Sequence, residues 1–170
     1  MTLDTAAIIA ETRAWVDRAV IGLNLCPFAK AVQVKGQIRY VVCPASEPAE
    51  LLNTLCDELH RLAESDPQDV DTTLLIHPAA LTDFLDFNDF LAVADAAVEE
   101  HGYAGILQVA SFHPQFQFAD THINDVSNAT NRAPFPTLHL LRESSIDRAV
   151  AAFPEAETIF EANIETLENL

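Results

Sequence analysis

The chain has 170 residues, of which 49% are hydrophobic and 21% are charged. These values predict a single domain over residues 1–170 with a hydrophobic core, and the order of the elements described below assigns that domain to the α/β class. Twenty-six acidic residues against nine lysines and arginines give a formal net charge of −17. An acidic surface repels the phosphates of nucleic acids and the head groups of anionic lipids, so we expect neither nucleic acid nor membrane as a partner.

The apolar stretches, the N-terminus and the cysteines together predict a cytoplasmic protein. The apolar stretches are shorter than the roughly 18 residues that a membrane-spanning helix needs. The N-terminus lacks the basic segment of a signal peptide and carries Asp4 and Glu11 instead. An odd number of cysteines, three, favours free thiols in a reducing compartment.

The first part of the chain predicts two helices around one strand. Apolar residues recur at helical spacing over residues 4–23, and Asp4 can cap that helix. Residues 37–43 alternate in β-branched and aromatic character, which indicates a strand, and residues 32–34 are expected to pair with it as a short hairpin. Leucines along one face predict a helix over residues 46–64.

The second part predicts three more strands, a long loop and further helices. The expected strands are 72–76, 106–112 and 137–141, and the expected helices are 82–101, 144–153 and a last one from Pro154 to the C-terminus. The order α-β-α-β-α-β-loop-β-α-α favours a four-stranded, mostly parallel or mixed sheet with flanking helices. A thioredoxin-like arrangement with an extra N-terminal helix is the alternative.

Two histidines follow predicted strands directly. His77 and His113 each end an apolar run and precede a proline, and Cys43-Pro44 ends the first strand in the same way. If the strands are parallel, these side chains lie at the carboxyl edge of the sheet, where open α/β sheets bind ligands. The structural alternative for each histidine is a ring that hydrogen-bonds to nearby backbone.

Cys26 lies in a segment with Lys30 and no acidic residue, a setting that would lower the pKa of a thiol. We therefore predict Cys26, His77 and His113 as catalytic residues for hydrolysis or group transfer. The alternative for Cys26 is a buried thiol at the corner between a helix and a loop.

Acid-free windows suggest where a small anion would bind. Residues 18–46, 101–119 and 126–142 contain no acid, although the chain is strongly acidic. If the windows converge, they form a positive concavity for a carboxylate or phosphate, which arginine binds in bidentate fashion. The residues expected to hold the anion are Lys30, Arg39, Asn131, Arg132 and Arg142. The alternative is that the windows are only buried strands and turns.

The aperiodic segment 115–136 contains phenylalanines, asparagines and prolines. Loops of this length are usually functional or disordered, and its aromatic content favours a lid over a pocket. Cys26, His77, His113 and His122 are residue types that bind zinc, but none has a metal-motif spacing, so a metal site is only an alternative. The sequence does not identify a cofactor, so the cofactor stays unknown.

Several segments are similar to those of one bacterial family. They are residues 22–29, 74–78, 86–90, 111–114 and 131–142. Over residues 12–167 the chain resembles an uncharacterised family catalogued as domain of unknown function 1415. The resemblance implies a small cytoplasmic bacterial protein and supplies no activity.

Three functions therefore stay open. The first is a pocket for a small anionic metabolite, with or without catalysis. The second is a non-catalytic acidic interaction protein, which would show scattered basic residues and a flat exposed apolar patch. The third is a metal-binding protein that uses Cys26, His77 and His113.

Overall fold

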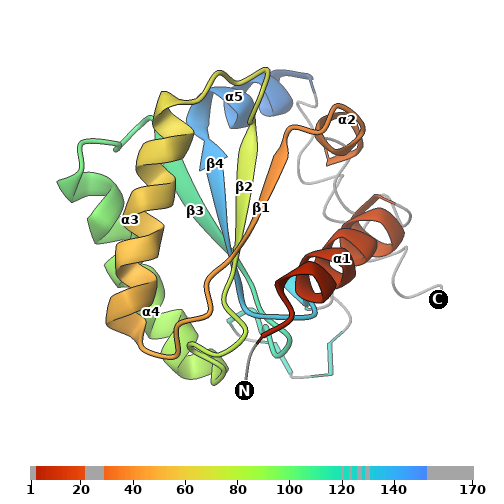
Figure 1. Ribbon diagram of the computed structural model, residues 1–170, viewed down its shortest axis with the longest axis vertical. Coiled ribbons are helices and arrows are strands. Elements are labelled where there is room, and N and C mark those ends of the chain that lie inside the picture. Colours follow the sequence, from red (N-terminus) through yellow and green to blue (C-terminus); the bar gives the residue numbers. More distant parts are fainter. Residues whose placement is uncertain are drawn as a thin grey trace.

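The computed structural model describes residues 3–21, 29–119, 121–122, 124–125, 128 and 131–152. In this part of the chain, helices flank a four-stranded sheet (Figure 1). The elements in chain order are α1 (Thr5–Trp15), the π-helical stretch η1 (Val16–Ile21), α2 (Ala29–Val34), β1 (Ile38–Val42), α3 (Pro48–Glu64), β2 (Thr72–Ile76), α4 (Phe84–Glu100), β3 (Leu107–Phe112), β4 (Thr137–Arg142) and α5 (Glu143–Ala152).

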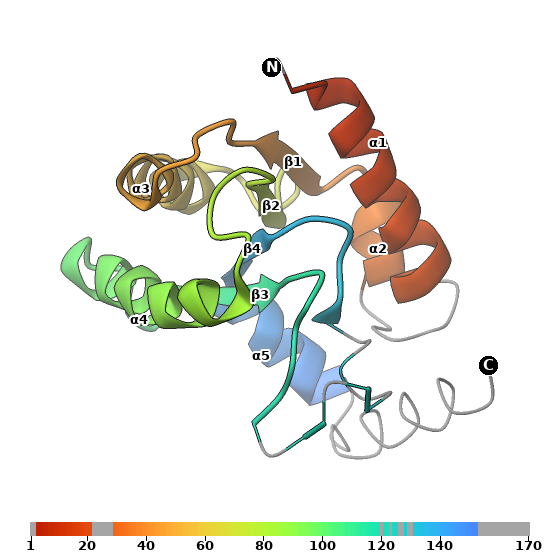
Figure 2. The same cartoon turned by 90° about the horizontal axis from the view of Figure 1, so that it is seen from below.

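The sheet is mixed and has the strand order β1-β2-β4-β3. β1 and β2 are parallel, and β4 is antiparallel to both of its neighbours, β2 and β3. β2 and β3 therefore run in the same direction with β4 between them. The predicted four-stranded mixed sheet with flanking helices is confirmed. The thioredoxin-like alternative is not, because α3 and α4 lie on the same face of the sheet (Figure 2), whereas that fold places its first two helices on opposite faces.

The main core lies between this face and the two long helices. Four leucines of α3 are almost fully buried (Leu51, Leu55, Leu59 and Leu62), and they pack in one cluster with Phe87, Ala94 and Val98 of α4. The sheet contributes Leu75, Leu138 and Leu140 to this cluster. Each buried leucine stabilises the fold by about 2 kcal/mol, so the helical leucine spacing explains why α3 forms and where it docks.

α1 and α2 lie on the opposite face of the sheet (Figure 2). The rings of Trp15 in α1 and Phe112 in β3 meet edge to face, with 5.2 Å between centroids. The guanidinium carbon of Arg13 lies 4.8 Å from the centroid of the Tyr40 ring in β1, within the range of a cation–π contact. These contacts attach α1 to both edge strands.

Most predicted elements are confirmed, with ends displaced by at most two residues, but two local predictions differ from the structure. The first helix ends at Trp15 and continues as η1 to Ile21, instead of running as one α-helix to residue 23. The hairpin strand predicted for residues 32–34 is wrong, since these residues end α2. Gly36 has a φ of +67°, and the N–H of Gln37 donates to the carbonyl of Val32, which closes the helix as a Schellman-type cap.

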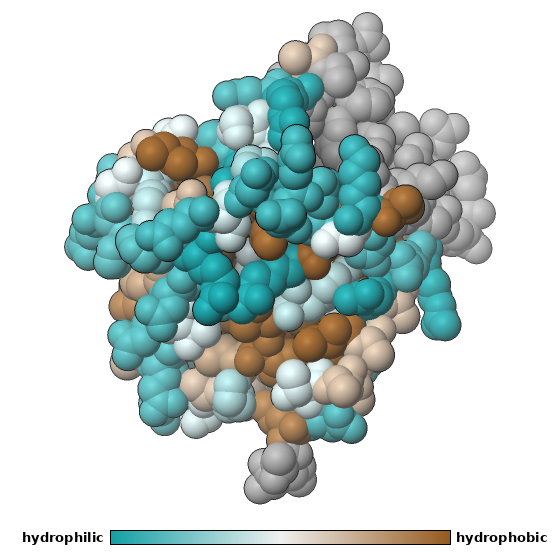
Figure 3. Space-filling model, turned by 45° about the horizontal axis from the view of Figure 1, so that its top comes forward, coloured by the Kyte–Doolittle hydropathy of each residue, from teal (hydrophilic) through white to brown (hydrophobic). Residues whose placement is uncertain are grey.

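The last helix, predicted from Pro154 to the C-terminus, falls outside the described residues. No helix among those described is long and apolar enough to cross a membrane. Figure 3 shows a face of the molecule that is mainly hydrophilic, with a contiguous hydrophobic area in its lower half.

Candidate functional site

His77 and His113 lie at the same edge of the sheet. Each is the residue after its strand, and β2 and β3 run in the same direction, so both imidazoles stand at the carboxyl edge as the sequence suggested. The backbone N–H of His77 donates to the carbonyl of Pro136 (2.9 Å), and that of His113 donates to Asn131 (3.0 Å). Residues 131–136 therefore pass between the two histidines on their way into β4.

His113 is bonded to backbone through both ring nitrogens. Its Nδ1 accepts a hydrogen bond from the N–H of Gln115 (3.0 Å), and its Nε2 lies 3.1 Å from the carbonyl oxygen of Leu81. Because a carbonyl can only accept, the proton is on Nε2 and the ring is neutral. Leu81 has a φ of +55°, a conformation that costs a residue with a Cβ about 1 kcal/mol or more. The two ring contacts of His113 match the structural alternative, in which the ring hydrogen-bonds to nearby backbone.

His77 uses only one ring nitrogen. Its Nδ1 donates to the carbonyl of Ala80 (2.9 Å), so Nε2 carries a lone pair. This Nε2 is buried and has no hydrogen-bond partner, and the whole residue is 0% exposed. An unsatisfied buried polar atom costs about 1–3 kcal/mol, so its retention calls for an explanation.

Aromatic side chains surround both imidazoles. The Phe87 ring of α4 lies 5.5 Å from the His77 ring and 5.0 Å from the His113 ring, and Phe84 lies 5.4 Å from His113, measured between centroids. Asp83 fixes this end of α4, because its carboxylate accepts hydrogen bonds from the N–H groups of Leu85 and Asp86.

Burial keeps both histidines neutral. It lowers the pKa of His77 from 6.5 to about 4, opposed by the hydrogen bond to Ala80 and assisted by the neighbouring His113. Burial also lowers the pKa of His113, opposed by its contact with the carbonyl of Leu81. A neutral imidazole with a free lone pair accepts a hydrogen bond, binds a metal or acts as a general base, whereas it gives no positive charge to an anion.

The segment after His113 is folded around a buried asparagine. Asn128 is 0% exposed, and its Oδ1 accepts hydrogen bonds from the N–H of Phe118 (2.8 Å) and from the Thr121 hydroxyl (3.3 Å). Its Nδ2 donates to the carbonyl of His122. The sequence places several asparagines in this segment, and nothing in their spacing distinguishes Asn128 from the others.

Two of the predicted ligand-binding residues are beside His113. Besides its backbone bond to His113, Asn131 donates a hydrogen bond from its side chain to the carbonyl of Ser111 (3.0 Å). Arg132 donates from Nε to the carbonyl of Phe116 (3.0 Å), in the segment that follows His113. Among the described residues that the sequence predicts to bind the anion, these two lie at the carboxyl edge.

Arg39 is held away from this edge by an ion pair. Its guanidinium makes two hydrogen bonds to the carboxylate of Glu58 on α3, at 2.9 and 3.2 Å. The Glu58 side chain is only 8% exposed, and these bonds raise the pKa of Arg39. Arg39 is three residues before Val42, the last residue of β1, which corresponds to about 10 Å along the strand. Its observed role is to neutralise a buried carboxylate in the core.

Arg142 stands at the opposite end of the sheet. It is the last residue of β4, which is antiparallel, so it pairs with Leu107 at the start of β3. Its Nη2 donates to the carbonyls of Ser65 (2.9 Å) and Val70 (2.8 Å), and the residue is 8% exposed. The structure therefore does not bring Arg39 or Arg142 to the histidines.

Two other predicted site residues are not described at this level: Cys26 lies outside the described residues, and so does the side chain of Lys30. Within the described residues, no group of three or more His, Cys, Asp or Glu side chains could hold a metal ion. A metal site that includes Cys26 stays a prediction.

The family described as "Protein of unknown function (DUF1415)" matches the chain over residues 7–170. No curated protein matches the chain, and no solved structure matches it.

Proposed function

Since the chain belongs to the DUF1415 family, whose description names no activity, we propose a function from the carboxyl edge: the protein binds a small metabolite at His77. The ligand would carry a hydroxyl or amine that donates to Nε2 of His77, and a carboxylate or phosphate. The observation that carries the proposal is the buried Nε2 lone pair, which has no partner.

The position of Arg132 supports the anionic part of the ligand. This arginine lies on the segment between His113 and β4, beside the carboxyl edge, and its Nε donates to the carbonyl of Phe116. A guanidinium can bond to backbone and to a bound oxyanion at the same time, because its donors point in several directions. Arg39 and Arg142 have no part in the proposed site, because Glu58 and two backbone carbonyls hold them elsewhere.

The proposal is one of binding, and catalysis would need more. Of the two histidines, His77 has the lone pair for a general base, whereas both nitrogens of His113 are bonded to backbone. Nucleophilic attack by Cys26, with His77 as its base, remains a prediction that depends on a residue outside the described part of the chain.

A thermal-shift screen of small hydroxylated or aminated carboxylates and phosphate esters tests the proposal, with calorimetry to measure the Kd of each stabilising compound. His77→Asn keeps a donor where Nδ1 stands and removes Nε2, so the Kd should rise at least tenfold, about 1.4 kcal/mol. His139→Gln alters another histidine, in the middle of β4, whose Nε2 lies 2.7 Å from the Thr72 hydroxyl, and should leave the Kd unchanged. An equal Kd for wild type and His77→Asn would overturn the proposal.

A further inference from the structure

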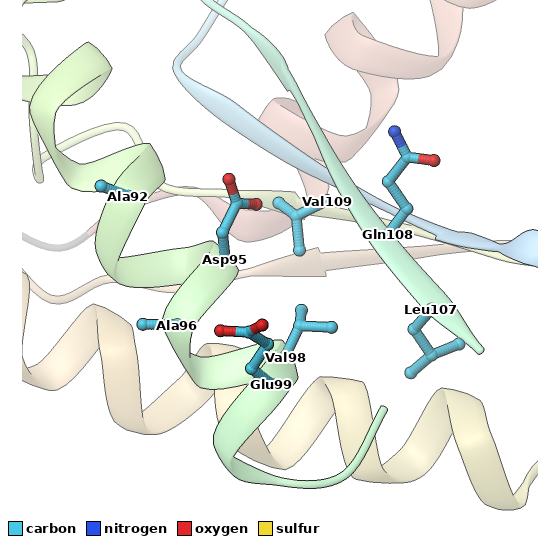
Figure 4. Close-up of a pocket in the computed structure, with 8 residues that line it drawn as sticks. All are labelled: Ala92, Asp95, Ala96, Val98, Glu99, Leu107, Gln108 and Val109. Carbon is cyan, nitrogen blue, oxygen red and sulfur yellow. The ribbon is translucent and has the colours of Figure 1, made fainter. Parts of the chain in front are cut away.

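A groove with a volume of about 490 Å³ lies between the C-terminal half of α4 and the first half of β3. Figure 4 shows side chains from both elements lining it, with Val98 on α4 and Leu107 and Val109 on β3 as its apolar part. His113 follows the other end of β3 and His77 lies at that same edge of the sheet, so the groove is separate from the site proposed above. Its volume is within the range of ligand-binding clefts, about 300–1,000 Å³.

One wall of the groove is an edge strand. β4 is the strand neighbour of β3 in the described sheet, and no described strand pairs with the other side of β3. An edge strand presents a row of backbone N–H and C=O groups to any extended chain that approaches it. β3 reads Leu-Gln-Val-Ala-Ser-Phe and so lacks the prolines and charged residues that commonly block such an edge.

The other wall supplies negative charge at a suitable spacing. Asp95 and Glu99 line the groove from α4, four residues apart, which corresponds to about 6 Å along a helix (Figure 4). In an extended chain, side chains two residues apart point to the same side and are about 6.8 Å apart. Two basic residues at alternate positions of a strand could therefore face these two carboxylates together.

The charge of the whole chain argues against a second copy as the occupant. Each copy has a formal net charge of −17, so two copies repel each other, and the two acids of the groove would add to that repulsion. A basic segment is instead attracted both by the groove and by the molecule as a whole.

We propose that the groove binds an extended segment of another protein that carries Lys or Arg at alternate positions and adds to β3 as a further strand. Backbone hydrogen bonds to β3 would supply the binding energy, and the pairs with Asp95 and Glu99 would supply the preference for basic sequences. The carbonyl of Ser111 already accepts a hydrogen bond from the Asn131 side chain, and the N–H of Leu107 donates to the carbonyl of Tyr103. The added strand would therefore pair mainly around Val109, in the middle of β3.

The probe is a synthetic peptide, Lys-Val-Lys-Val-Lys-Val with both termini blocked, titrated into the ¹⁵N-labelled protein and followed by amide NMR. The largest shifts are expected in β3 and the second half of α4, and alternate amides of β3 should exchange more slowly with solvent. Glu-Val-Glu-Val-Glu-Val should not bind.

Charge reversal provides the matched variants. Asp95→Lys combined with Glu99→Lys should weaken binding of the basic peptide at least tenfold. Asp57→Lys combined with Asp89→Lys changes the net charge by the same amount at exposed positions outside the groove and should weaken it less than threefold. The amide spectrum of each variant verifies that it is folded.

Three results would overturn the proposal. They are shifts that map away from β3, equal weakening by the two double variants, and equal binding of a linear polyamine and the basic peptide. The last result would assign the groove to small organic cations.

Discussion

At the end of β4, Arg142 donates two hydrogen bonds to the carbonyls of Ser65 and Val70, whereas at the opposite end of the sheet the Nε2 of His77 is buried with no partner. Both side chains are polar and more than 90% buried. The charged one joins the turn after α3 to the sheet, and the neutral one keeps a lone pair on a ring that lies 5.5 Å from the Phe87 ring, measured between centroids.

The contrast teaches that basic residues in an acidic chain are not by themselves a sign of an anion site. Arg142 has a lowered pKa because of its burial, yet its contacts are those of a structural residue. The Nε of Arg142 is also buried without a partner, but its Nη2 bonds to two backbone carbonyls that hold the side chain in place. The unpaired Nε2 of His77 belongs instead to a residue at the carboxyl edge of the sheet, where open α/β sheets bind ligands. The predictions below test this distinction from the largest expected effect to the smallest.

Replacing Arg142 should have the largest effect on stability. Arg142→Met removes two charge-assisted hydrogen bonds and leaves two carbonyls without their donors, so we expect the free energy of unfolding to fall by about 3 kcal/mol. Arg148→Met is the control, since the Arg148 side chain is 71% exposed and its ion pair with Asp71 is long, at 3.7 Å, so the pair should contribute less than about 1 kcal/mol. Urea denaturation measures both, and equal losses would contradict the structural role of Arg142.

Breaking the pair between Arg39 and Glu58 should have the next largest effect. Arg39→Leu leaves the buried Glu58 carboxylate with only the longer 3.8 Å contact to Arg61, so we expect a loss of about 2 kcal/mol. The double variant Arg39→Leu/Glu58→Leu should recover most of this loss, because no buried charge is left unpaired. If the double variant is as unstable as the single one, the pair is not what stabilises this part of the core.

The pH dependence of stability tests the neutral state of His77. Its folded pKa of about 4 is below the unfolded value of 6.5, so the unfolded chain takes up the proton first as the pH falls. The part of the unfolding free energy that depends on a neutral His77 is present above pH 6.5 and is lost between pH 6.5 and about 4. At about 1.4 kcal/mol per pKa unit, wild type should lose about 2 kcal/mol more than His77→Asn between pH 7 and pH 4.5.

Urea denaturation at both pH values makes this comparison. Burial also lowers the pKa of His139 to about 4. His139→Asn should therefore reduce the loss of stability between pH 7 and pH 4.5 by a similar amount. A dependence on pH that is identical in wild type and His77→Asn would show that His77 is already protonated or is accessible to water.

The smallest expected effect is the difference in stability between substitutions at the two histidines of the carboxyl edge. His77→Asn and His113→Asn remove the same atoms, and an asparagine retains a polar group close to Nδ1. At His77 the lost nitrogen has no partner, whereas at His113 it bonds to the carbonyl of Leu81. We therefore expect His113→Asn to be less stable than His77→Asn by about 1 kcal/mol at pH 7, measured by urea denaturation. The reverse order would contradict the assigned contacts.

Much of the fold could be predicted from local sequence patterns. The leucine spacing of α3 and the continuous apolar run of β2 defined those elements, and the strand-end histidines were placed at the correct edge because β2 and β3 share a direction. Val32, Gln33 and Val34 were misread as a strand because β-branched residues favour strands, whereas a glycine cap makes them the last turn of a helix.

The partners of the site residues could not be predicted, because they are distant in the sequence. Arg39 finds Glu58 on the next helix, and Arg142 finds carbonyls more than 70 residues earlier. Counting charges in a window shows where acids are absent but not what the basic residues contact. The antiparallel direction of β4, which places Arg142 at the opposite end of the sheet from the histidines, is likewise a property of the whole sheet.

The most direct test of the central claim is an NMR measurement on the ¹⁵N-histidine-labelled protein at pH 7, in which two-bond couplings assign the protonation of each ring nitrogen. The structure predicts that His77 is protonated on Nδ1 with a bare Nε2, and that His113 is protonated on Nε2. Adding a ligand found in the thermal-shift screen should move the Nε2 resonance of His77 and leave that of His113 nearly unchanged. A protonated Nε2 at His77, or a resonance that no stabilising ligand moves, would contradict the account.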